Sequence, residues 1–258
     1  MDFKRDDVMT NRNERGESKS RAANRYEFAA LAMAIAVAAT PIAAHANADD
    51  VAGLYGPQPP ADATYLRVVN LSARGAKVTL PGGVQPVDVG PGAATALDVV
   101  RPGTPLVVKV GGEVPVRPAG GATLAGPDTI GSTITVAVEE SGAGNWRALP
   151  IAVPASSDDA LRAQLRLFNF AEGCDGKVAL ERSGAAVFEH VATGHAAARS
   201  INPVAATLVA VCGNAVSPPF SLPRLAAGQR YSLFLSGPAT RPVLRGAPDT
   251  LDWPRATR

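Results

Sequence analysis

Two cysteines and three histidines are the side chains of this sequence with the clearest capacity for chemistry. Cys174 and Cys212 both lie in segments that are typical of turns. A catalytic thiol needs a positioned base, and the candidates are His190 and His195. An even pair of cysteines in an exported chain is otherwise typical of a disulfide. We therefore expect a Cys174–Cys212 disulfide, with two free thiols or a catalytic thiol as the alternatives.

The order of strands and turns is compatible with this disulfide. Counting up-and-down strands from Leu165 places turns near residues 174, 184, 193, 204 and 212. The first and fifth of these turns then lie at the same end of the domain.

No other group of residues in the sequence completes a site. His45 lies in the N-terminal segment, while His190 and His195 are five positions apart in a segment typical of strand, turn and strand. This odd spacing would put them on opposite faces of a single strand, and no further residues complete a metal site. The adjacent pair Asp158-Asp159 cannot flank a glycosidic bond as two catalytic carboxylates must. The sequence also has no nucleophile elbow, phosphate-binding loop or dinucleotide fingerprint. We predict a protein without catalytic, cofactor-binding or metal-binding residues, and hence not an enzyme.

A repeated strand organises the rest of the chain. Residues 65–71 (YLRVVNL) recur as residues 164–170 (QLRLFNF), and three further segments repeat at offsets between 97 and 102 positions. This spacing is far longer than that of solenoid repeats, so it indicates tandem domains with the same strand order. We predict that the domains superpose with Leu66 on Leu165 and Val110 on Val211.

Side-chain alternation assigns the two faces of each repeated strand. One face of each is predicted to lie in a core, through Leu66, Val68, Leu165 and Leu167. The asparagine near each strand end, Asn70 or Asn169, is expected to bond the backbone of the following turn. Arg67 and Arg166 lie on the other face, where we expect solvent or a carboxylate of a neighbouring strand.

The N-terminal segment resembles a secretory signal. Residues 1–48 contain a polar, charged stretch, an Ala-rich apolar run from Phe28 to Ala39, and small residues suited to cleavage before Asp49. We expect a periplasmic protein, with an uncleaved segment that anchors the chain to the inner membrane as the alternative.

The balance of charge argues against a nucleic-acid partner. Residues 1–48 contain seven of the 25 basic and six of the 23 acidic residues, which leaves 18 and 17 in the mature chain. A nucleic-acid-binding protein usually carries a basic stripe. Any contact with an acidic polysaccharide would have to be local.

Composition and turn spacing predict an all-β fold. The mature chain is rich in Ala, Val, Gly and Pro, and short apolar segments alternate with turn residues, as in β-sandwiches. We expect two tandem β-sandwich domains of similar topology. The predicted boundaries are a signal at 1–48, domains at 49–149 and 161–246, a short linker at 150–160 and a tail at 247–258.

Several short motifs resemble the alginate-biosynthesis protein AlgF family. They are GLYGP at 53–57, YLRVVN at 65–70, LRLFN at 165–169, INPV at 201–204 and RPV at 241–243. This resemblance spans residues 50 to 258 and rests on the order and spacing of the motifs. The cysteine pair, the Gly-rich first domain and the Ala/Arg-rich tail depart from the family pattern.

The resemblance implies a non-catalytic periplasmic accessory protein required for O-acetylation of an exported polysaccharide, either alginate or cellulose. The implied partners are a membrane-bound O-acyltransferase and SGNH-type acetyltransferases, with the polysaccharide as a further partner. Candidate partner-contact residues lie on the N-terminal arm and near the C-terminus: Leu54, Tyr55, Pro57, Arg241 and Arg245.

Two other functional classes remain open. A pair of carbohydrate-binding modules would need exposed aromatic rings, for which Tyr55, Trp146 and Trp253 are the candidates. A periplasmic assembly chaperone would instead use exposed strand edges.

Overall fold

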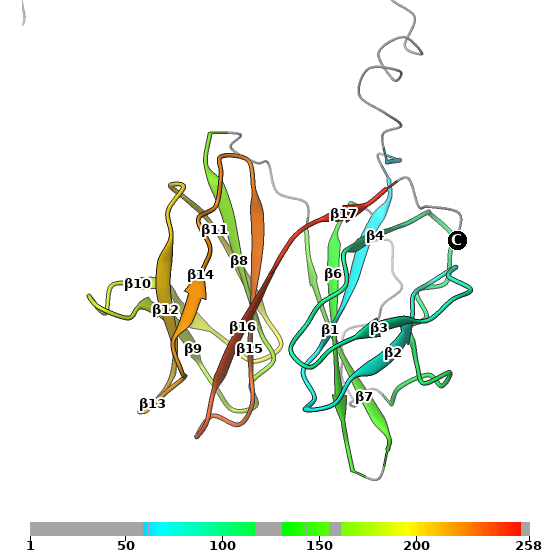
Figure 1. The fold of residues 1–258 in the computed structure, drawn as a ribbon, viewed down its shortest axis with the longest axis horizontal. Coiled ribbons are helices and arrows are strands. Elements are labelled where there is room, and N and C mark those ends of the chain that lie inside the picture. The colour runs from blue at the N-terminus through cyan, green and yellow to red at the C-terminus, as the bar shows by residue number, and fades with distance from the viewer. Residues whose placement is uncertain (1–58, 61, 117–130, 143, 155–160, 254–258) are drawn as a thin grey trace, which may run out of the picture. The chain divides into compact units, whose positions relative to one another are not determined.

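The computed structural model describes residues 59–60, 62–116, 131–142, 144–154 and 161–253. Within these ranges every regular element is a β-strand, which confirms the all-β class (Figure 1). The predicted signal segment, most of the predicted linker and the arm with Leu54, Tyr55 and Pro57 lie outside the described residues. None of the described residues belongs to a helix long and apolar enough to cross a membrane.

The first half of the chain forms two facing sheets. One has the strand order β17-β4-β1-β6-β7 and the other β3-β2-β5. The strands from this half are β1 (Thr64–Asn70), β2 (Ala76–Thr79), β3 (Val87–Val89), β4 (Leu97–Val100), β5 (Lys109–Val110), β6 (Thr133–Glu140) and β7 (Trp146–Val153). The strand β17 (Leu251–Asp252) joins this half from the C-terminal end of the chain.

The second half repeats the arrangement. Its sheets have the orders β11-β8-β15-β16 and β10-β9-β12-β13, with β14 also paired to β12. The strands are β8 (Ala163–Asn169), β9 (Gly176–Leu180), β10 (Ala186–Val191), β11 (Ala196–Ile201), β12 (Ala206–Cys212), β13 (Ala215–Val216), β14 (Phe220–Leu222), β15 (Arg230–Ser236) and β16 (Val243–Pro248).

Strand register shows that the two halves are copies of one module. In the first, β1 lies between antiparallel β4 and parallel β6, and Leu66 pairs with Ile134. In the second, β8 lies between antiparallel β11 and parallel β15, and Leu165 pairs with Tyr231. The predicted superposition of Leu66 on Leu165 is therefore confirmed.

The predicted equivalence of Val110 and Val211 is wrong by one residue. Val110 pairs with Val78 of β2, whereas the residue opposite the corresponding Val178 of β9 is Ala210. Both Val110 and Ala210 are buried. The sequence comparison aligned Val110 with Val211, an offset of 101, because both are valines. The residue at the equivalent position is the alanine between Val209 and Val211.

Each module has its own apolar core, and the four residues predicted for these cores are buried. Leu66 and Val68 lie in the first cluster, with Val78, Val110 and Ile134. Leu165 and Leu167 lie in the second, with further side chains from both sheets: Val178, Phe188, Leu208, Leu222, Leu233 and Leu235. Truncation of such side chains typically costs about 2 to 5 kcal/mol.

The strand-end asparagines have the role that the sequence predicts. The Asn70 side-chain amide donates to the carbonyl oxygens of Arg74 and Val89, and its oxygen accepts from the Ser72 amide. The equivalent Asn169 amide donates to Cys174 and Val191. Each asparagine therefore fixes the turn that leads to the second sheet of its module.

A third apolar cluster joins the two modules. Its buried members come from the outward faces of the central strands of both: Val69, Ala137, Ile151, Phe168, Phe170 and Phe234. The central strands therefore bury both faces, one in their own module and one against the other module. We call this shared layer the junction.

Two predicted boundaries change. Pro150 lies within β7, opposite Val136, rather than in a linker. Because β7 is an edge strand, it can contain a proline, whose missing N–H costs no hydrogen bond on the side without a partner strand. The predicted tail also begins too early, since β16 extends to Pro248 and β17 pairs with β4.

Candidate functional site

The Cys174–Cys212 disulfide is present, as the sequence predicts. It joins the turn after β8 to the end of β12, with a Cα–Cα distance of 5.2 Å. Four consecutive strands, β9 to β12, lead from the turn with Cys174 to Cys212 at the end of β12, and this even number brings both cysteines to the same end, as strand counting predicts.

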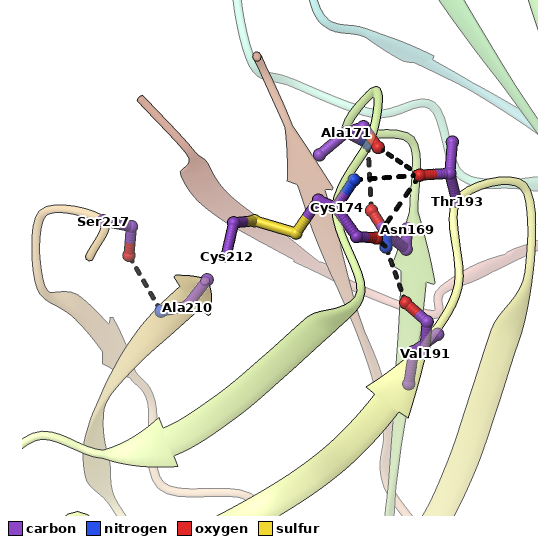
Figure 2. Close-up of a disulfide and its surroundings, with 8 residues drawn as sticks. All are labelled: Asn169, Ala171, Cys174, Val191, Thr193, Ala210, Cys212 and Ser217. Atoms are coloured by element: carbon purple, nitrogen blue, oxygen red, sulfur yellow. Dashed lines mark hydrogen bonds between the residues drawn. A yellow bond between two sulfur atoms is a disulfide. The ribbon is translucent and has the colours of Figure 1, made fainter. Parts of the chain in front are cut away.

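A polar cluster holds the disulfide end of the second module (Figure 2). The Asn169 amide donates to the Cys174 and Val191 carbonyl oxygens at 2.8 and 2.7 Å. The Thr193 hydroxyl donates to the Ala171 carbonyl oxygen at 2.6 Å. These bonds satisfy the backbone of a tight turn, so the cluster supports the structure at this end of the module.

The first module lacks this disulfide. The residue equivalent to Cys174 is Arg74, whose carbonyl oxygen accepts from Asn70, and Arg74 forms an exposed ion pair with Glu140. The residue equivalent to Cys212 is Gly112. The same fold is therefore held by a covalent link in only one of its two copies.

Removal of the disulfide should destabilise the second module. The bond closes a separation of 38 residues, for which chain-entropy reasoning gives about 3 to 4 kcal/mol. We expect a Cys174→Ala/Cys212→Ala variant to lose about this amount in denaturant unfolding. Reductant should lower the stability of the parent but leave the variant unchanged. Two free thiols in the exported protein, found by non-reducing mass spectrometry, would contradict the assignment.

Neither histidine acts as a base for a cysteine thiol in the structure. His190 is exposed and its Nδ1 lies 2.7 Å from Asp175 Oδ2, and this bond raises the pKa of His190. His195 Nδ1 lies 3.1 Å from the Thr193 carbonyl oxygen. Since both cysteines are in the disulfide, neither histidine faces a free thiol. Among the described residues no group of three or more His, Cys, Asp or Glu could hold a metal ion.

The candidate contact residues near the C-terminus occupy different environments. Arg241 is exposed in the turn between β15 and β16. Arg245 is also exposed, on β16, but its guanidinium lies against Gly92 of the first module, where an added Cβ would come within 2.9 Å of Nε. Arg241 is thus free of the junction, whereas Arg245 packs across it.

The strongest electrostatic feature is a group of buried charges at the junction. Arg67 is fully buried, and its Nη1 lies 2.5 Å from Asp249 Oδ1. Arg67 Nε also donates to the Thr135 hydroxyl at 3.0 Å. Arg166, the equivalent of Arg67 in the second module, lies 3.7 Å from the other oxygen of Asp249. We call Arg67, Arg166 and Asp249 the junction triad.

Of the two alternatives expected for Arg67, solvent or a carboxylate of a neighbouring strand, the structure shows a carboxylate, although Asp249 lies between strands. Both arginines face the opposite module instead of water, and Asp249 comes from the segment between β16 and β17. The Arg67 guanidinium also lies over the Phe234 and Phe168 rings, 4.9 and 5.3 Å from their centres. Stacking of this kind is a favourable way to bury a guanidinium.

Burial lowers the pKa of both arginines. For Arg67, desolvation is opposed by the charge and hydrogen bond of Asp249. For Arg166, desolvation again dominates and Asp249 opposes it. Arginine remains charged at any physiological pH. The triad therefore places two positive charges against one negative charge inside the protein, where the carboxylate is indispensable.

The candidate sugar-stacking rings are partly covered. Trp146 is half-buried and packs against the first core. Trp253 is half-buried as well, and the Arg101 guanidinium lies 6.0 Å from the centre of its ring. The third candidate, Tyr55, lies outside the described residues.

Comparisons with solved structures give low-scoring likenesses. The chain is similar to the C-terminal domain of AlgF from P. aeruginosa, with a TM-score of 0.31 and 20% identity, covering 34% of this chain and 98% of that domain. It is also similar to a putative cell adhesion protein from Bacteroides ovatus, with a TM-score of 0.21 and 13% identity, covering 72% of this chain and 96% of the other. No family model and no curated protein matches the chain. The likenesses concern the fold alone.

Proposed function

We propose that this protein is a non-catalytic accessory component of a system that O-acetylates an exported polysaccharide in the periplasm. The observation that carries the proposal is the ordered set of motifs that resembles the AlgF family. Two of these motifs, YLRVVN and LRLFN, lie in β1 and β8, the central strands of the two modules. Part of the resemblance thus falls on the strands that build both cores and the junction.

The junction suggests how such a component would act. The two modules are joined by a buried apolar cluster and by an ion-paired triad. Their relative position is therefore held by direct contacts between them. Each module adds a second sheet, β3-β2-β5 or β10-β9-β12-β13, on the far side from the junction. Two partners bound to the two modules would be kept close together, which raises their effective concentration.

In this proposal the partners are a membrane-bound O-acyltransferase and SGNH-type acetyltransferases, which carry out the chemistry. Arg241 and the arm with Leu54, Tyr55 and Pro57 are the proposed contact residues, whereas Arg245 packs against Gly92 at the junction. Alginate is the polymer that the resemblance favours, and cellulose is the alternative.

Gene deletion and complementation test this proposal. We expect the deletion strain to export its polysaccharide without O-acetyl groups, as measured by the acetyl content of purified polymer. Complementation with Arg241→Glu or Tyr55→Ala should restore acetylation only partly, with an unchanged melting temperature. The matched control is Arg182→Glu, which alters an exposed arginine in the turn between β9 and β10 and should complement fully.

Two results would overturn the proposal. One is an unchanged acetyl content in the deletion strain. The other is acetyl transfer or esterase activity of the purified protein alone that disappears when His190 or His195 is replaced, since this would make the protein an enzyme.

A further inference from the structure

We propose that the outer edge of β11 binds an extended segment of a partner protein that carries an apolar residue beside an acidic one. The segment would add a strand to the second module and place its apolar side chain in the adjoining cavity. This site does not depend on the proposed role in polysaccharide acetylation. It is argued from the difference between the two copies of the module.

The equivalent edge in the first module is already occupied by an added strand. β17 pairs in parallel with β4, with Leu251 opposite Leu97 and Asp252 opposite Asp98. The Leu97 amide donates to the Thr250 carbonyl oxygen at 2.7 Å. This module therefore uses strand addition at this edge, with a segment from the far end of the chain.

In the second module β11 occupies the place of β4, but none of the described residues forms such a strand at its edge. The pairing of β11 with β8 makes Ala198 the equivalent of Leu97 and Arg199 the equivalent of Asp98. In the described part of the chain β11 pairs only with β8. The Ala198 backbone groups that correspond to those engaged by β17 are exposed and lack a strand partner. An unpaired edge of this kind is a template for another strand.

A cavity adjoins this edge in each module. In the first, a cavity of about 220 Å³ is lined by Val99, Val100 and Arg101 together with Trp253, which follows β17. In the second, the equivalent residues Ser200, Ile201 and Asn202 line a cavity of about 270 Å³. Its floor is formed by apolar side chains of the core: Leu165, Leu180, Leu208 and Leu222. The residue that follows an added strand would thus meet an apolar cavity that can take a large side chain.

Charge at the cavity selects an acidic segment. Arg162 and Arg199 both line it. Arg162 donates to the Ser200 carbonyl oxygen and Arg199 to the Val187 carbonyl oxygen, at 3.0 Å each. Among the described residues neither arginine has a carboxylate within ion-pair distance. In the first module Asp252 of the added strand lies opposite Asp98, whereas an acidic residue at the same register in the second module would lie opposite Arg199. A carboxylate placed opposite Arg199 would gain a charge-assisted bond.

A second copy of this chain is a poorer occupant than a different protein. The chain's own strand of suitable composition, with Leu251, Asp252 and Trp253, is already engaged with β4 of the same chain. Each copy therefore uses its own segment, and the β11 edge remains for a segment of another protein.

Peptide binding to the intact mature protein tests the site. The probe is a synthetic peptide with the sequence of residues 248–254 (PDTLDWP), which has the required apolar and acidic residues. We expect saturable binding, with amide chemical-shift changes at Ala198 and Ser200 in NMR spectra of the isotope-labelled protein. A peptide with both aspartates replaced by lysine should bind at least about tenfold more weakly, a difference of about 1.4 kcal/mol.

Two variants distinguish strand pairing at the β11 edge from non-specific peptide binding. Ala198→Pro removes the outward amide and should weaken binding at least about tenfold. Arg199→Glu leaves the backbone edge intact and should weaken binding while reducing its salt dependence. Arg182→Glu, whose side chain does not line the cavity, should bind as the parent does. Unchanged melting temperatures would establish that each variant is folded. If Ala198→Pro does not fold, the binding measured for Arg199→Glu decides the test.

The proposal is overturned if the peptide does not bind, if its shifts are confined to Leu97 and its neighbours, or if both edge variants bind normally. Concentration-dependent dimers that disappear when residues 250–258 are deleted would also overturn it, because the occupant would then be a second copy. Loss of acetylation in cells has no bearing on these measurements, so the site and the proposed function can fail separately.

Discussion

Replacement of Asp249 by alanine should cost about 3 to 5 kcal/mol, because it leaves two buried guanidiniums without their counter-charge. Arg67 would lose an ion pair of 2.5 Å at a site that is closed to water. Arg166 would lose its nearest carboxylate, and the Ser232 hydroxyl would lose its acceptor. Chemical denaturation monitored by circular dichroism measures the loss directly.

Two comparisons define this effect. Asp88→Ala removes a carboxylate from the exposed Lys77–Asp88 pair and should change the free energy of unfolding by at most about 1 kcal/mol. An Arg67→Met/Asp249→Ala double variant should be more stable than the sum of the single changes predicts, because removal of Arg67 also removes a charge that has lost its partner. Additive single effects would mean that the triad is not a coupled unit.

Replacement of Phe168 by alanine should cost about 3 to 5 kcal/mol as well, because the ring fills the centre of the junction. Phe168 is fully buried, and its ring lies 6.0 Å from that of Phe234 and 6.4 Å from that of Phe170. The Arg67 guanidinium would also lose one of the two aromatic rings against which it packs. Unfolding of the parent is expected as one transition, and the variant should unfold at lower denaturant.

Val84→Ala is the control for this prediction. Val84 is 89% exposed in the first module, so its truncation should change stability by no more than about 0.5 kcal/mol. A Phe168→Ala variant as stable as this control would show that the modules are joined only by the covalent chain in solution.

The repeated strand allowed much of the fold to be predicted. Alternation in residues 65–71 and 164–170 identified Leu66 and Leu165 as core residues, and the duplicated segments identified the shared strand order. Strand alternation and the repeat were sufficient here, because the core of each module is formed by strands that are close together in the sequence. The disulfide followed for the same reason, since Cys174 and Cys212 are separated only by successive strands of one module.

The junction was not predicted, because strand alternation does not reveal what covers the second face of a strand. One signal was available in β8, where Leu165, Leu167 and Phe168 form a nearly continuous apolar run. Such runs are typical of strands buried on both faces. The pairing of Arg67 with Asp249 could not be read in this way, because the two residues are 182 positions apart and belong to different modules.

The position of Asp249 also sets an order of events during biosynthesis. Arg67 belongs to the first strand of the first module, but the carboxylate that neutralises it is contributed only after β16 has been made. β17, which completes the edge of the same module, follows still later. N-terminal domains usually fold first as a chain emerges, but here the charged face of the leading module lacks its carboxylate until the segment after β16 has been released. A chain that ends early would retain an unneutralised arginine and an uncovered β4 edge, and both would distinguish it from the finished protein to proteases and chaperones.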